Sequence, residues 1–196
     1  KIYKLSELGN MRAELGGLNA PAAIAVDATS GDVYVACANS VVRCDRWAEP
    51  IQTFYGYSDP QALAFDNGLG YLWVADTGNG RVVKVKRYGE IASASRALEA
   101  PSAIAVNPRT GFCFAADRDN GRIVSLTGDG STRWTNEDFR KPTALAANPS
   151  DMSLWVADAD GFVVAKLYGD TGEAGDYNSL AGFGNPVALY SDPGIR

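Results

Sequence analysis

Residues 60–66 read PQALAFD, and this stretch decides the fold because the chain repeats it four more times. The other copies are PAAIAVD from Pro21, PSAIAVN from Pro101, PTALAAN from Pro142 and PVALYSD from Pro186. Successive copies begin 39, 41, 41 and 44 residues apart. A period of about 40 residues with strand-like content predicts a propeller or a solenoid rather than a single compact core.

Each repeat unit continues with the same order of apolar runs and turns. In the second unit the motif is followed by the turn NGLG at 67–70, the run LWVAD at 72–76, the turn TGNG at 77–80 and the run RVVKVK at 81–86. The last segment, EIASASRAL at 90–98, is more polar. This pattern predicts a four-stranded antiparallel sheet whose inner strands are covered on both faces and whose outer strand meets solvent.

The sequence therefore predicts an all-β fold, a β-propeller of four-stranded antiparallel blades. We expect four complete blades with partial blades at both ends, which together form part of a six-bladed ring in a longer protein. Residues 1–20 are predicted to be the last two strands of a preceding blade, residues 21–59, 60–100, 101–141 and 142–185 to be complete blades, and residues 186–196 to be the first strand of a further blade.

The composition of the chain argues against several classes of partner and catalytic site. The net charge is −5 and no basic stripe is present, which argues against nucleic acid or an anionic membrane as the partner. No apolar run approaches the ~20 residues that span a bilayer, so no membrane span is expected. The chain has no histidine, which excludes Ser–His and Cys–His dyads and histidine metal sites within it. We expect no catalytic residue, metal or cofactor in this sequence.

The second apolar run of each unit carries an aromatic residue in register. These residues are Tyr34, Trp73, Phe114 and Trp155. Their spacing matches that of the prolines, so packing between neighbouring blades explains them best. Trp73 and Trp155 are therefore predicted to be structural residues. A stacking platform for a sugar or base would need rings exposed at a shared mouth, which the apolar LWVAD setting does not favour.

The combination of these motifs resembles the NHL repeat, best over residues 60–85 and 101–126. The signature Asp-x-x-Asn-x-Arg of that family is present in the second and third units, as Asp76, Asn79 and Arg81 and as Asp117, Asn120 and Arg122. The family's eponymous histidine is replaced by Gly80 and Gly121. YWTD-type and streptogramin-lyase-like propellers share much of this pattern.

The outer units depart from the signature. The first unit has Cys37 and Asn39 and no matching arginine, and the fourth has Asp158 followed by a shorter turn into Phe162.

The Asp–Arg pairs fit a structural role. Asp76 and Arg81 flank a four-residue turn, as do Asp117 and Arg122, so each pair is expected to face across a hairpin. A charge pair at an exposed turn contributes about 0.2–1 kcal/mol to stability.

The resemblance implies a non-catalytic scaffold that presents one face to a protein partner. Candidate binding residues are those that differ between the units, namely Arg43, Arg46, Trp47, Arg109, Arg118 and Trp134. Tryptophan and arginine are the side chains favoured at interface hot spots.

Two alternatives remain open at this point. Some related six-bladed propellers are lactonases, lyases or hydrolases with a site at the central channel, where a calcium site would use oxygens such as those of Asp27, Glu99, Asn107 or Asn148. Turn capping is the better interpretation of Asp27, Asn107 and Asn148, because each follows the first run and precedes a turn. The other alternative is a structural module of a large surface or filament assembly, completed by strand addition from a neighbouring segment or chain.

Overall fold

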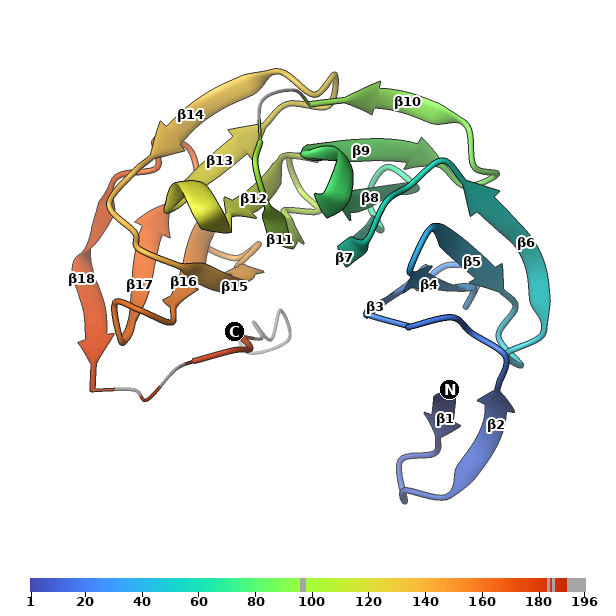
Figure 1. The fold of residues 1–196 in the computed structure, drawn as a ribbon. Helices are drawn as coiled ribbons and strands as arrows, with labels where there is room; N and C mark the ends of the chain where they lie inside the picture. Colours follow the sequence, from blue (N-terminus) through green and yellow to red (C-terminus); the bar gives the residue numbers. More distant parts are fainter. Residues whose placement is uncertain (96–97, 183, 185, 190–196) are drawn as a thin grey trace.

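The computed structural model describes residues 1–95, 98–182, 184 and 186–189 (Figure 1). Within these residues the strands form four four-stranded antiparallel sheets and one two-stranded sheet. The described part contains no α-helix, only the short 3₁₀ turns η1 (Thr77–Asn79) and η2 (Arg118–Asn120). No helix in it is long and apolar enough to cross a membrane. The predicted all-β propeller fold of four-stranded blades is confirmed.

The strands follow one another within each sheet in chain order. The two-stranded sheet contains β1 (Ile2–Leu5) and β2 (Met11–Leu15). The four complete sheets contain β3 (Ala23–Val26), β4 (Val33–Cys37), β5 (Ser40–Cys44) and β6 (Pro50–Tyr55); β7 (Pro60–Asp66), β8 (Tyr71–Asp76), β9 (Arg81–Lys86) and β10 (Ile91–Ala94); β11 (Pro101–Val106), β12 (Cys113–Asp117), β13 (Arg122–Leu126) and β14 (Thr132–Asn136); and β15 (Pro142–Ala147), β16 (Ser153–Asp158), β17 (Val163–Tyr168) and β18 (Ala174–Ala181).

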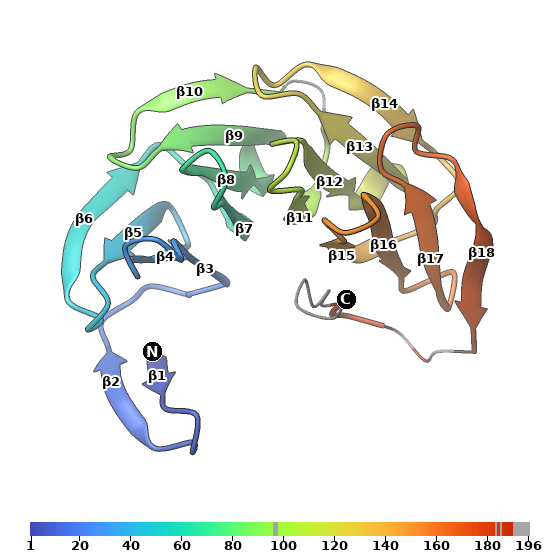
Figure 2. The ribbon, with the colours of Figure 1, turned by 180° about the vertical axis from the view of Figure 1, so that it is seen from behind.

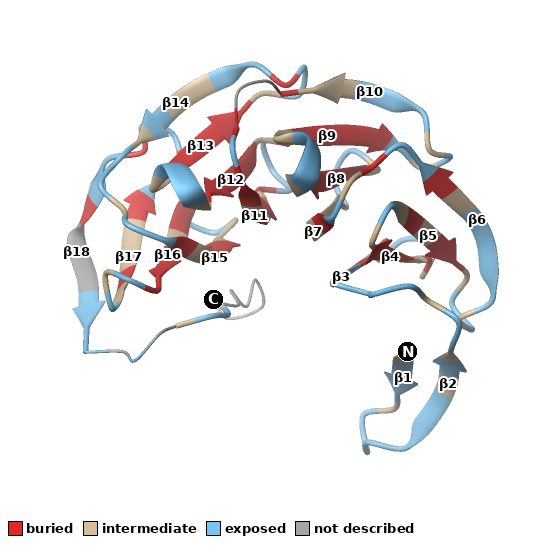
Figure 3. Ribbon diagram, viewed as in Figure 1, coloured by how far each residue is buried: buried red, intermediate tan, exposed pale blue. Residues whose placement is uncertain are grey.

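The sheets succeed one another along an arc, and the described residues do not close it into a ring (Figures 1 and 2). The first strands β3, β7, β11 and β15 lie innermost, where neighbouring blades contact one another, and β6, β10, β14 and β18 form the outer rim. Burial follows this gradient, because the second strands are buried almost throughout, whereas the outer strands β6, β10 and β14 are exposed or intermediate at every position except Phe54 (Figure 3). The polarity gradient along each repeat therefore has a direct structural cause.

The core lies between the sheets, at the blade junctions. The recurring aromatics of β4, β8 and β12, namely Tyr34, Trp73 and Phe114, are all buried. Tyr34 stacks on Phe65 of the next blade with ring centroids 5.4 Å apart. Trp155 of β16 is only partly buried.

The Asp76–Arg81 pair was expected to lie at an exposed turn, and this expectation is wrong for the aspartate. The Asp76 carboxylate is fully buried. Its oxygens accept hydrogen bonds from the Ser58 backbone N–H (2.7 Å), from Asn79 Nδ2 and from Arg81 Nε (2.7 Å). Ser58 lies in the connection that leads into the first strand of the same blade. The carboxylate therefore joins the turn after β8 to the start of β7, which sequence spacing alone does not show.

The same arrangement recurs in the next two blades. Asp117 accepts from the backbone N–H groups of Glu99 and Ala100 and from Arg122 Nε. In the fourth blade Asp158 accepts from the backbone N–H groups that lead into β15, at residues 140 and 141. A buried carboxylate at this position thus fastens the entry of each of these blades.

The turn from β16 to β17 corrects a second expectation, since it is not shorter than its counterparts. Asp158 pairs with Val163 in the register that joins Asp76 to Arg81. Phe162 therefore stands at the position of Gly80, and it adopts a left-handed conformation with φ 54° beside φ 60° for the glycine. The fourth blade keeps the turn and loses both the glycine and the arginine.

Candidate functional site

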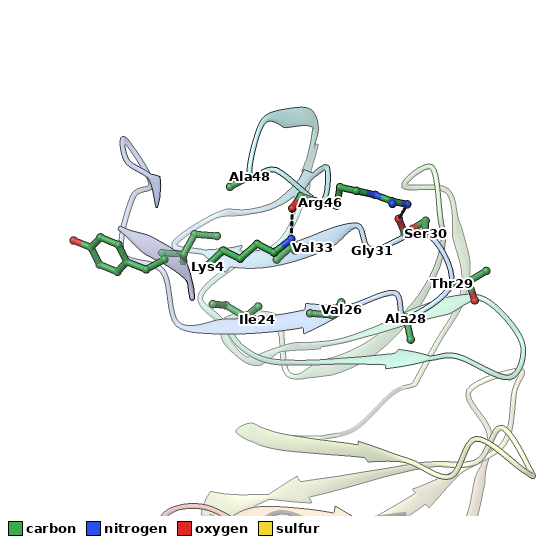
Figure 4. A pocket seen from close by; sticks show the side chains of 12 residues that line it. Lys4, Ile24, Val26, Ala28, Thr29, Ser30, Gly31, Val33, Arg46 and Ala48 are labelled. Carbon is green, nitrogen blue, oxygen red and sulfur yellow. Dashed lines mark hydrogen bonds between the residues drawn. The ribbon is translucent and has the colours of Figure 1, made fainter. Parts of the chain in front are cut away.

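A groove opens between the two-stranded sheet β1–β2 and the inner strands of the first complete blade. Its volume is about 530 Å³. The residues that define this N-terminal groove are Ile2, Lys4, Ile24, Val26, Val33 and Arg46. Figure 4 shows Ile24 and Val26 projecting from β3 on one side and Lys4 extending from β1 above them.

The floor of the groove is apolar and open to solvent. Ile24 is 51% exposed and Val26 49% exposed. The residues at the Ile24 position in the second and fourth blades, Leu63 and Leu145, are only 9% and 8% exposed. The difference arises because β7 and β15 pack against a preceding blade with all four strands, whereas β3 faces a sheet of two strands in the described residues.

The upper wall of the groove is held in place by hydrogen bonds and carries positive charge. The Lys4 ammonium donates to the Arg46 carbonyl at 2.7 Å and lies 5.2 Å from the centroid of the Trp47 ring. Arg46 Nη2 donates to the Ser30 carbonyl at 2.6 Å. The turn between β5 and β6 is therefore tied both to β1 and to the turn between β3 and β4 (Figure 4).

The contact between Lys4 and this turn follows a rule of the fold. The turn between the third and fourth strands of a blade receives a hydrogen bond from an outer strand of the preceding blade: Gln52 Nε2 donates to the Tyr88 carbonyl, and Trp134 Nε1 to the Gly169 carbonyl. Lys4 donates to the Arg46 carbonyl in the corresponding turn of the first complete blade, from the inner strand β1 of the two-stranded sheet. The β1–β2 sheet thus contacts the first complete blade at the same turn at which neighbouring complete blades contact one another.

One of the six residues predicted from the sequence to bind a partner lines this groove, and a second contacts the lining residue Lys4. Arg46 lines it, and Trp47, 65% exposed, lies beneath the Lys4 ammonium. Arg43 is buried instead, where its Nε donates to Asp32 Oδ2 at 2.9 Å. Its charge is therefore satisfied inside the first blade.

The remaining three candidates all lie on the third blade, in separate parts of it, and are not among the residues that line the groove. Arg109 is exposed and donates to the Pro149 carbonyl. Arg118 pairs with the adjacent Asp119 at 2.7 Å. Trp134 is partly buried and packs on Phe114, with ring centroids 5.7 Å apart.

Sequence reasoning missed Lys4, Ile24 and Val26 as groove residues. Ile24 and Val26 belong to the repeated motif, whose other copies are covered by a neighbouring blade. Nothing in the motif itself shows that this copy is uncovered. One signal was available, since Lys4 aligns with Lys84 when residues 2–11 are compared with residues 82–91.

Three of the four residues considered for a calcium site act as turn caps, and the backbone N–H of the fourth, Glu99, donates to Asp117. Asp27 accepts from the backbone N–H groups of Thr29 and Ser30, Asn107 from that of Arg109, and Asn148 from that of residue 150. Burial raises the pKa of Asp27, but these hydrogen bonds and the Arg87 guanidinium leave it below its ordinary value. No group of three or more Cys, Asp or Glu side chains suited to a metal is found within the described residues.

Comparison with known proteins supports the fold. No protein-family model matches the sequence, and no curated protein matches it. Among solved structures, a chain of a nidogen/laminin complex is similar with a TM-score of 0.76 and 19% identity, over 97% of this chain and 77% of that one.

Two lyase structures are also similar. A streptogramin B lyase gives a TM-score of 0.72 at 16% identity, over 87% of this chain and 57% of that one. The virginiamycin B lyase from Staphylococcus aureus gives 0.66 at 18% identity, over 76% and 52%. This chain thus spans little more than half the length of either lyase. At these identities the likeness establishes the propeller fold alone.

Proposed function

We propose that this chain is a non-catalytic, NHL-type propeller module that binds a protein partner through the N-terminal groove. The observation that carries the proposal is the half-exposed pair Ile24 and Val26 beneath a positively charged wall. Apolar surface of this kind is covered at the other blade junctions, and covering it here is favourable in proportion to the area removed from water.

Two further observations support the proposal. The NHL signature is present in the second and third blades, where Asp76 and Asp117 are buried acceptors that hold the scaffold rigid. One of the similar structures comes from a complex of nidogen with laminin, which gives a precedent for protein binding by a chain of this shape.

Site-specific photocrosslinking tests the proposal. A photoreactive amino acid at Val26 is expected to give a discrete protein adduct in an extract of the source cells or matrix. The same group at Ile91, an equally exposed position on the outer strand β10, serves as the matched control. Adducts of the same identity and yield at both positions, or no adduct at Val26, would contradict the proposal.

A further inference from the structure

The second and third strands of the blades carry a repeated pair of side chains. Tyr34 lies opposite Arg43, Trp73 opposite Lys84 and Trp155 opposite Lys166 in the strand register. The Lys84 ammonium lies 5.3 Å from the Trp73 ring and that of Lys166 5.8 Å from the Trp155 ring. A cation within about 6 Å of a ring face is attracted by it. A cation on the third strand thus marks the position of an aromatic residue on the second.

The third blade reaches the same arrangement by another route. Phe114 lies opposite Ser125, which carries no charge. Arg133 of β14 donates to the Ser125 hydroxyl at 3.3 Å and so brings a cation to this position from the fourth strand.

Lys4 is the counterpart of these cations in the two-stranded sheet. It pairs with Ala13 of β2 as Lys84 pairs with Ser93 of β10. In the described residues β1 pairs with β2 alone, so its other edge, where a second strand would lie, has no strand beside it. An unpaired edge presents N–H and C=O groups that can pair with an added strand.

The groove floor fits the aromatic residue that such a strand would bring. At the next junction Tyr34 of the second strand stacks on Phe65 of the following blade at 5.4 Å. Phe65 holds the position in its motif that Val26 holds in the first. An aromatic side chain placed opposite Lys4 would therefore cover Val26 and its neighbour Ile24.

We propose that the N-terminal groove binds an extended polypeptide segment that pairs antiparallel with β1 and places an aromatic side chain opposite Lys4, against Ile24 and Val26. This inference rests on the proposed protein-binding function and names the chemistry of the partner: one aromatic residue flanked by aliphatic and small residues. Main-chain hydrogen bonds supply affinity in this mode of binding, and the pocket for the side chain supplies specificity.

The chain itself supplies a probe of this chemistry. A fluorescein-labelled peptide with the β8 sequence of residues 71–76, YLWVAD, is expected to bind with saturable anisotropy. The peptide with alanine at the tryptophan position should bind at least about thirtyfold more weakly, as for a hot-spot aromatic. A peptide copied from β9, residues 81–86 with the sequence RVVKVK, contains no aromatic residue and should not bind.

Variants of the protein locate the site. Val26→Glu is expected to abolish peptide binding, and Ile91→Glu, at an equally exposed position far from the groove, to leave it unchanged. Lys4→Ala should weaken binding about two- to fivefold, the size of one cation–aromatic contact. Hydrogen exchange should show new protection of the amides of Ile2–Leu5 on binding, which a contact through side chains alone would not produce. Thermal melts establish that each variant is folded.

The outcomes separate this inference from the proposed function. Equal binding of the tryptophan and alanine peptides, binding that survives Val26→Glu, or no new protection of β1 would overturn the strand mode. If Val26 still crosslinks to a protein in that case, the proposed protein-binding function is supported, and binding through a strand added to β1 is ruled out. A dimer in solution that Val26→Glu converts to a 20.8 kDa monomer would make a second copy the occupant and would also overturn it.

Discussion

Trp73 is the largest side chain of the described residues with no exposed surface. It packs with Cys113 and Val124 of the neighbouring blade, and its indole Nε1 has no hydrogen-bond partner in the part of the chain that the structure describes. Replacement by alanine removes most of the contact at this junction. We expect Trp73→Ala to lower the free energy of unfolding by about 3–5 kcal/mol in urea denaturation.

Trp73→Phe is the matched variant for this prediction. The unpaired indole N–H contributes no hydrogen bond, so its removal loses packing volume only. The phenylalanine variant is therefore expected to lose less than half as much stability as the alanine variant. Equal losses would show that the N–H group has a partner, and a loss below 1 kcal/mol for alanine would contradict the burial.

Asp117 gives a pH-dependent prediction. Burial raises the pKa of Asp117, but hydrogen bonds from Asn120, from the backbone of Glu99 and Ala100 and from Arg122 outweigh it and leave the pKa below its ordinary value. A carboxyl group with a lowered pKa in the folded state stabilises the fold above its unfolded pKa of about 3.9. That contribution is lost as the pH falls through the lower, folded value.

Asp117→Asn tests this sign. The free energy of unfolding of the variant is expected to be about 1–3 kcal/mol lower at pH 7. The reason is that an amide is a weaker acceptor than the buried carboxylate for the charged and backbone donors around it. Urea titrations at several pH values measure the free energy of unfolding of the variant and of the parent protein. The difference between these two free energies should shrink as the pH falls below about 4. Asp160→Asn is the control, since Asp160 is exposed and touches Lys141 only at 3.8 Å. A gap that stays constant down to pH 3 would show that ionisation of Asp117 does not stabilise the fold.

At the scale of the element, the turn between the second and third strands shows how one backbone shape is kept by different residues. Gly80 has φ 60°, and a Cβ added to it would lie 2.6 Å from the Leu98 carbonyl oxygen. Phe162 holds the equivalent place with φ 54° and 56% exposure. A bulky residue in this left-handed region is strained by about 1–3 kcal/mol, which glycine avoids.

We therefore expect opposite effects from exchanges at the two turns. Gly80→Ala should lower the free energy of unfolding by about 1–3 kcal/mol. The positive φ is strained for alanine, and its Cβ would lie too close to the Leu98 carbonyl oxygen. Phe162→Gly should stabilise by up to about 1 kcal/mol, since relief of strain exceeds the added freedom of glycine in the unfolded chain. Melting temperatures of the two variants measure this. A loss of stability in Phe162→Gly would indicate that the exposed ring makes a contact worth more than the strain.

Elements also show where sequence reasoning succeeds and where it stops. Short apolar runs separated by turn residues predict the strands of blades two to four, because those runs are buried wherever a neighbouring blade covers them. The same reasoning fails for Asp76, whose burial depends on a contact with Ser58, 18 residues earlier in the chain. It also fails for the length of the turn at Phe162. A glycine in the sequence indicates a residue with left-handed backbone conformation, whereas a phenylalanine at the same place gives no such indication.

At the scale of the whole molecule, the repeat predicts the four-stranded blades of a propeller. It does not predict which blade has an uncovered face in the described residues. The motif beginning at Pro21 looks like every other copy, yet Ile24 and Val26 are uncovered because the neighbouring sheet has only β1 and β2 in the described residues. The groove arises from residues 2–4 meeting residues 24–33, a juxtaposition that no local pattern encodes. The candidate site is thus a property of the arrangement, whereas the six binding residues proposed from the differences between repeat units lie in the first and third blades.

This arrangement predicts a gradient of local stability along the arc. A two-stranded hairpin has little independent stability, and β1–β2 exposes most of its residues. Strands β8 and β12 lie inside four-stranded sheets between neighbouring blades and are buried almost throughout. Amide hydrogen exchange should therefore give Ile2–Leu15 at least about a hundredfold less protection than β8, equivalent to about 2.7 kcal/mol in opening free energy.

The outer strand β6 (Pro50–Tyr55) is the control for that gradient. It is exposed to a similar degree, but it belongs to a sheet of four strands. Exposure alone would give β6 and β1–β2 the same protection, whereas incompleteness of the sheet predicts that β1–β2 exchanges faster. Equal protection of β6 and β1–β2 would mean that the hairpin is held as firmly as a complete blade. The groove would then be a rigid surface rather than an edge ready to pair with an added strand.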